Sequence, residues 1–204
     1  GWILLIIVLL FVQAYSDLAL PEYTSRIVDT GIQQKGIPDA VPDRIRETTL
    51  TGLTMLMDQE DASQVLDAYT DAEDGVCQLK DISDSRREEL NDSMGLAMMV
   101  SMMAASEGMD LTQQVPQEQI QAILDQANAQ KEQISDSIVT QMAVTFVQQE
   151  YEAMGEDLAQ IQMNYLIRTG VQMLGLALIS MMAAVLVTFL ASRVAALLGH
   201  DLRL

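Results

Sequence analysis

Two long apolar runs enclose a polar middle section of the chain. The first run extends from Trp2 to Leu20, and as a helix its 19 residues would measure about 28 Å. Because the hydrocarbon core of a bilayer is about 30 Å thick, this run predicts a transmembrane helix. The alternative is a cleaved signal peptide, since residues 14–16 have the small-residue spacing of a cleavage site. The second apolar run favours the transmembrane interpretation.

The second run extends from Tyr165 to Leu198, and residues 171–190 at its centre carry no charge. As a helix it would measure about 51 Å, so we expect it to leave the membrane and continue in water. Arg193 and Arg203 lie near its end, which places the C-terminus in the cytoplasm by the positive-inside rule. Two spans then put the N-terminus in the cytoplasm as well, and the middle section outside the cell.

Small residues recur along the second run at steps of three and four. This spacing predicts a face on which a neighbouring helix can pack closely in lipid. The alternative is that an alanine-rich helix produces such a stripe by chance. The residues of the stripe are Ala177, Ser180, Ala184, Thr188, Ala191, Ala195 and Gly199.

Polar residues occur near the end of the first run, at Gln13, Ser16 and Asp17. Polar groups in a membrane helix usually face protein or water, so these residues are candidates for a transport pathway or a helix interface. The alternative is that they already lie in the membrane–water interface.

The middle section, residues 22–163, has the periodicity of helices. It predicts a helix that starts near the two Pro-Asp pairs at 38–39 and 42–43 and runs to about Met57. Further helices are predicted at 60–69, at 83–105, from Pro116 and at 134–151, with a turn at Asp74-Gly75 and a break near Gly155. Alternating β-branched runs are missing, so we expect little sheet. The predicted class is all-α, with transmembrane helices at 1–21 and 164–204 and an extracellular helical domain at 22–163.

The charge is concentrated in this middle section. The chain carries 29 acidic and 11 basic residues, a net charge of −18. Residues 22–163 hold 27 of the acids and 8 of the bases, which gives −19. Such acidity excludes a nucleic-acid-binding surface, and a chain that is 50% hydrophobic is too apolar to be disordered.

The sequence predicts no catalytic, cofactor-binding or metal residue. The acidic stretch that ends at Gly75 fails as a calcium loop, because Thr70 and Ala72 would occupy ligand positions. Weak binding of cations by the crowded acidic residues is an alternative for which the sequence specifies no site. Phosphate-binding loops and serine nucleophile elbows do not occur. The single cysteine, Cys77, and the single histidine, His200, exclude an internal disulfide and a His-cluster metal site.

A group of methionines lies in the helix predicted at 83–105. We interpret these residues mainly as part of a helical core. An adaptable apolar contact surface is the alternative, and copper(I) binding is a distant third. The group comprises Met94, Met98, Met99, Met102 and Met103, and Met109 follows.

The first run ends in Asp17-Leu18-Ala19-Leu20-Pro21 and is followed by Ile27-Val28-Asp29-Thr30-Gly31-Ile32. The tail of the chain contains Ala191, Ser192, Arg193, Val194, Ala195, Gly199, Asp201, Leu202 and Arg203. In these residues both ends of the chain resemble the transmembrane domain of bacterial ABC exporters, and the more specific match is the tail. It is similar to the extension of the family's second helix toward the first coupling helix. The resemblance covers about a third of the chain.

The resemblance implies a multi-pass plasma-membrane exporter with six transmembrane helices per subunit, of which this chain holds two. It also implies a second subunit, as a homo- or heterodimer, and nucleotide-binding domains that bind ATP and Mg²⁺ outside this chain. The 142 residues between the spans depart from the short loop usual in the family and imply an extracellular insertion. The main alternative is a two-span sensor or chemoreceptor input region, and a third is a membrane-anchored interaction domain.

Overall fold

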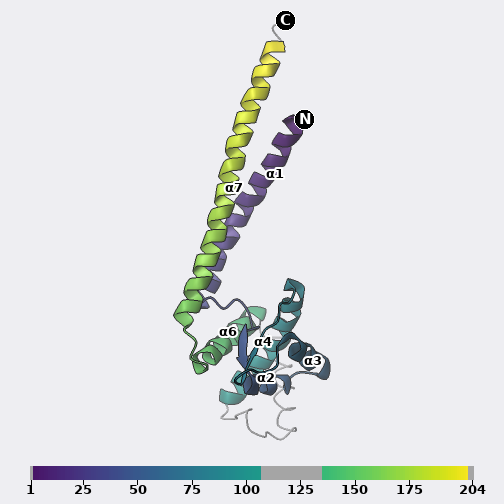
Figure 1. Ribbon diagram of the computed structural model, residues 1–204, viewed down its shortest axis with the longest axis vertical. Coiled ribbons are helices and arrows are strands. Elements are labelled where there is room, and N and C mark those ends of the chain that lie inside the picture. The colour runs from purple at the N-terminus through teal and green to yellow at the C-terminus, as the bar shows by residue number, and fades with distance from the viewer. Residues whose placement is uncertain (1, 107–134, 202–204) are drawn as a thin grey trace. The chain divides into compact units, whose positions relative to one another are not determined.

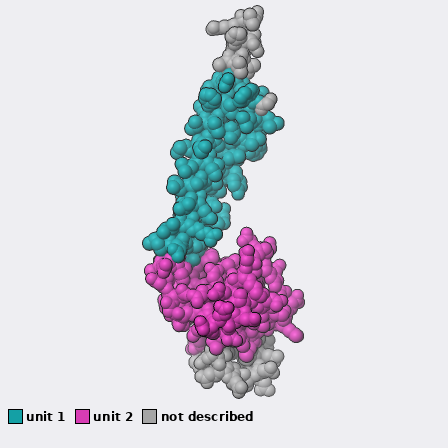
Figure 2. Space-filling model, in the orientation of Figure 1, with its two compact units in different colours: residues 1–36, 162–204 teal, residues 37–161 magenta. Residues whose placement is uncertain are grey.

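The computed structural model describes residues 2–106 and 135–201, without the side chains of residues 136 and 196–201. The chain forms two compact units (Figure 2). We call residues 1–36 and 162–204 the helix-pair unit, and residues 37–161 the middle unit. The described residues are mainly helical, which confirms the predicted all-α class.

The helix-pair unit consists of two long helical segments (Figure 1). The first is α1 (Trp2–Arg26), which continues as the π-helix η1 (Ile27–Gln33). The second is α7 (Leu158–Asp201), whose first turn belongs to the middle unit. The predicted domain boundary at residue 22 differs from this division, because the helix continues through Pro21. Proline fixes φ at a helical value and removes only one backbone donor, so the helix need not end there.

The middle unit is built around two helices, α4 (Asp84–Ser106) and α6 (Asp136–Ala153), which pack against each other (Figure 1). Two short helices, α2 (Glu47–Thr54) and α3 (Gln59–Ala68), pack against α4. Leu158 and Ile161 of α7 also join this core. The helix predicted from Pro116 lies outside the described residues.

Turns and caps explain where several of these elements begin and end. The Asp58 carboxylate accepts a hydrogen bond from the Asp61 amide at 2.8 Å and caps α3. Asp74 and Gly75 both have positive φ, 53° and 76°, as a tight hairpin turn between Glu73 and Val76 requires. Gly155, with φ of 76°, follows α6. The turn, the break and the helices near 60–69, 83–105 and 134–151 are therefore confirmed.

The prediction of a helix start at the Pro-Asp pairs is wrong. Residues 44–46 form strand β1 (Arg44–Arg46), which pairs antiparallel with β2 (Val76–Gln78), and α2 begins only at Glu47. Ile45 opposes Cys77 in this small sheet and is fully buried. Side chains from distant elements hold the backbone of residues 39–46 in place, and local propensity does not reveal such contacts.

Candidate functional site: the pair of long helices

The two segments of the helix-pair unit run antiparallel, and side chains connect them at several levels of the first segment. Contacts occur at both ends and in the middle of the first segment. In each contact the two residue numbers add up to nearly the same value, as they do when two antiparallel helices keep one register. The register is therefore continuous. The contacts are Trp2 with Arg193 (5.8 Å from the ring centroid), Asp17 with Ser180 (2.5 Å), and the Gly31 carbonyl with Gln162 Nε2 (2.8 Å).

The facing positions follow a seven-residue repeat in both segments. Side chains spaced alternately by three and four are less exposed than their neighbours, which is the pattern of coiled-coil packing. On the first segment these positions are Ile6, Leu9, Gln13, Ser16, Leu20, Tyr23, Ile27 and Thr30, and on α7 they are Thr169, Met173, Leu176, Ser180, Ala183, Val187, Leu190 and Val194.

Polar residues form one layer of this interface. Ser16 is 1% exposed and, in this register, lies at the level of Ser180. The Ser180 hydroxyl donates to Asp17 Oδ1, and Gln13 is half-buried one turn away along α1. The structure thus brings Asp17 and Ser180 into contact across the helix pair, whereas a pathway-lining role for the polar residues of α1 remains a prediction.

The segments approach each other closely at Gly31 in η1. A Cβ atom at this position would lie 2.5 Å from Leu166 Cδ2, so only glycine fits without a shift of the leucine. The Gly31 carbonyl accepts its hydrogen bond from Gln162 on the facing helix. A side chain of α7 therefore satisfies a backbone group at the end of the first segment.

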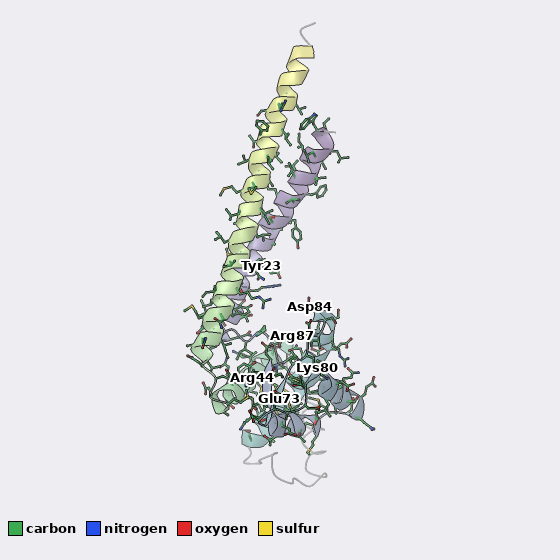
Figure 3. The ribbon with its side chains drawn as sticks, in the orientation of Figure 1. Tyr23, Arg44, Glu73, Lys80, Asp84 and Arg87 are labelled. Carbon is green, nitrogen blue, oxygen red and sulfur yellow. The ribbon has the colours of Figure 1, made fainter. Side chains whose placement is uncertain are left out.

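An aromatic ring with an arginine lies at each end of the apolar part of α1. Arg26 lies over Tyr23 at 5.6 Å, and Arg193 lies over Trp2 at 5.8 Å; Tyr23 is labelled in Figure 3. Trp2 and Tyr23 are separated by about 32 Å of helix, close to the hydrocarbon thickness of about 30 Å. Tryptophan and tyrosine concentrate at membrane–water interfaces, so the two pairs fit the two faces of a bilayer.

Both helices are long and apolar enough to cross a membrane. Only 6% of the most apolar window of the first segment, and 17% of that of α7, is buried. The core helix of a soluble protein would be mostly buried, so these helices differ from one. The prediction of two helices capable of spanning a membrane is therefore confirmed.

The predicted small-residue stripe coincides only in part with the face toward α1. Ser180 lies on that face, and Ala177 and Ala184 flank it half-buried. Thr188, Ala191 and Ala195 are exposed, and the surroundings of Gly199 are not described. The Thr188 and Ser192 hydroxyls donate to backbone carbonyls one turn earlier, at 2.9 and 2.8 Å, which satisfies them within their own helix.

The family-like tail is helical through Asp201. Within it, Ala191, Ser192, Arg193 and Ala195 are exposed and Val194 is half-buried against the first segment. Leu202 and Arg203 lie outside the described residues, and His200 and Asp201 have no described side chain.

An ion pair between the half-exposed Arg46 and the buried Glu150 connects β1 to α6 in the middle unit. The Glu150 carboxylate, 4% exposed, accepts hydrogen bonds from the Arg46 amide, the Arg46 guanidinium and the Thr49 hydroxyl at 2.7–3.1 Å. Burial alone would raise the pKa of Glu150. The bonds from Arg46 and Thr49 outweigh that effect, so the pKa lies below its ordinary value.

A second set of contacts holds the segment before β1. The Arg87 guanidinium, labelled in Figure 3, donates to both Asp39 oxygens at 2.6 and 3.0 Å and to the Val41 carbonyl at 2.7 Å. The Tyr151 hydroxyl accepts from the Asp43 amide, and burial of the phenol raises the pKa of Tyr151 to about 12. These side chains explain why residues 39–43 are fixed without a helix or a strand.

The alternative of a methionine contact surface is wrong for three of its five residues. Met94, Met98 and Met99 are completely buried in the core of the middle unit. Met102 and Met103 are half-buried, and Met103 packs against the same core. The structure therefore agrees with the core interpretation for these residues.

The Cys77 thiol is poorly placed to react. It lies in β2 opposite Ile45 and is buried, and this burial raises the pKa of its thiol. Among the described residues, no group of histidine, cysteine and acidic side chains is arranged to hold a metal ion.

Comparisons of the chain with protein-family models, with curated proteins and with solved structures gave no match.

Proposed function

We propose that the chain is the membrane-spanning part of an ATP-driven ABC exporter and holds its first two transmembrane helices. In this proposal the middle unit is an extracellular insertion, and both ends of the helix pair face the cytoplasm. The observation that carries it is the length of α7, which runs unbroken for 44 residues. A helix of that length measures about 66 Å, twice the hydrocarbon thickness, and must extend beyond the bilayer.

The part of α7 from about Arg193 onward would act as a lever. Binding of ATP and Mg²⁺ by separate nucleotide-binding domains would move this extension, and α7 would carry the movement into the membrane. The antiparallel packing of α7 against the first segment supports this role, because a helix that transmits a movement must contact a neighbouring helix in the membrane. The exposed Thr188, Ala191 and Ala195 offer a small-residue face for further helices or for a second subunit.

The proposal is tested on the complete protein with its nucleotide-binding domains in lipid nanodiscs. A spin label is attached at Ala195→Cys in a Cys77→Ala background, and the distance between labels of the two subunits is measured. Trapping with ATP, Mg²⁺ and vanadate should change this distance relative to the nucleotide-free protein, and ADP alone should not. An unchanged distance would refute the lever and leave the two-span sensor as the better account.

A further inference from the structure

Arg193 and Trp2 together form an unassigned feature at one end of the helix pair. We propose that they bind the phosphate of an anionic phospholipid in the cytoplasmic leaflet. This inference rests on the membrane topology of the proposed function. It adds a ligand class and two ligand-contacting residues that transport by itself does not require.

The two arginine–aromatic pairs differ in their charge partners. At the Tyr23 end, Arg26 forms an ion pair with Glu22 at 2.5 Å, so its charge is neutralised within the protein. At the Trp2 end, no described side chain forms an ion pair with Arg193. A guanidinium at the edge of an apolar helix, with no ion-pair partner among the described side chains, favours an anion from its surroundings.

The position of Arg193 limits what that anion can be. It is the only charged residue between Arg168 and His200, so it follows directly on an uncharged stretch. Of the 29 acids, 25 belong to residues 37–161, and Asp17, Glu22 and Asp29 lie toward the other end of the first segment. The remaining acid, Asp201, is eight residues beyond Arg193, about 12 Å along a helix. Protein carboxylates are therefore scarce near Arg193, whereas lipid phosphates are abundant at the edge of the hydrocarbon core.

The local geometry suits a headgroup phosphate. The guanidinium presents several donors in a planar fork that matches two phosphate oxygens, and the Trp2 ring lies on one side of it, 5.8 Å from the ring centroid. Ala191, Ser192 and Ala195 beside it are small and exposed, so they leave room for the headgroup. An anionic headgroup without an ammonium group should bind better than a zwitterionic one, because nothing offsets its charge.

Trp2 provides the probe, since it is the only tryptophan of the chain. The chain is reconstituted into vesicles in which either phosphatidylglycerol or phosphatidylcholine carries brominated acyl chains, which quench nearby tryptophan fluorescence. We expect phosphatidylglycerol to compete for the site beside Trp2 about fivefold better than phosphatidylcholine. Added inorganic phosphate should leave this preference unchanged if the ligand is the lipid.

Variants distinguish lipid binding at Arg193 from a general effect of the positive charges of the chain. Arg193→Gln should abolish the preference, Arg193→Lys should keep part of it, and the matched control Arg168→Gln should keep all of it. Circular dichroism and quenching by brominated phosphatidylcholine show that each variant is folded and inserted.

The possible failures are distinguishable. If neither brominated lipid quenches Trp2, the helix is not in the membrane and the proposed function fails with the inference. If both lipids quench equally, or if Arg193→Gln keeps the preference, the chain is inserted but the phosphate site is refuted. Loss of the preference on adding inorganic phosphate would assign the site to a free anion and would also overturn the lipid proposal.

Discussion

At the scale of single residues, several polar side chains of the apolar helices have identifiable hydrogen-bond partners. Thr188 and Ser192 bond within their own helix, whereas Asp17 reaches across to Ser180. Only the second kind of bond can stabilise the pair. Bonds between membrane helices contribute about 0.6 kcal/mol on average and up to about 1.7 kcal/mol.

We predict that Asp17→Ala and Ser180→Ala each destabilise the helix pair by about 1 kcal/mol, and that their effects are coupled. A double-mutant cycle from detergent unfolding of the reconstituted chain measures this coupling. Ser192→Ala is the control and should change the free energy of unfolding by less than about 0.5 kcal/mol. Strictly additive effects of the two variants would show that the contact adds no stability.

The Glu150–Arg46 pair predicts a pH dependence in the middle unit. Because the pKa of Glu150 is lowered by folding, its contribution is complete above the unfolded pKa of about 4.3 and disappears as the pH falls through the lower folded pKa. Glu150→Gln should therefore cost about 2 kcal/mol at pH 7. The difference from the wild type should shrink below about pH 4.

Urea titrations of the reconstituted chain, followed by circular dichroism at several pH values, provide this measurement. The other carboxylates of the unit are common to both proteins, so the difference isolates Glu150. The exposed Glu88→Gln is the matched control, with an expected change below about 0.5 kcal/mol at all pH values. A difference that stayed constant with pH would contradict the assignment.

At the scale of elements, α4 contributes more buried residues to the core of the middle unit than any other described element, and three of them are methionines. Met98→Ala should destabilise this unit by about 3 kcal/mol, because it removes a completely buried side chain. Met102→Ala, at a half-buried position of the same helix, should cost clearly less. The same urea titration compares the two variants, and equal effects would argue against the core assignment of Met98.

The elements also show what sequence reasoning can reach. The bounds of α4, the turn at Asp74-Gly75 and the break at Gly155 follow from local signals, so they were predictable. Strand β1 was not, because three residues give no period and its partner β2 is distant in the sequence. The paired face of α7 was missed for a different reason. In a helix that is apolar all round, Leu190 and Ala191 look alike, and only the neighbouring helix distinguishes them.

At the scale of the whole molecule, charge and hydrophobicity are divided between the two units. Residues 37–161 hold 25 acids and 6 bases, a net charge of −19, and the helix-pair unit carries 4 acids and 5 bases, or +1. An acidic domain is repelled by anionic headgroups, while a nearly neutral helix pair can enter the bilayer. This division fits a chain that crosses the membrane twice with its acidic part in the external solution.

Labelling of intact cells tests this topology most directly. Single cysteines at the exposed Ser63 and Ala195, in a Cys77→Ala background, are treated with a membrane-impermeant maleimide. We predict that Ser63→Cys is labelled from outside and that Ala195→Cys is labelled only after the membrane is permeabilised. Labelling of both positions in intact cells, or of Ala195→Cys alone, would contradict a double crossing with an external middle unit.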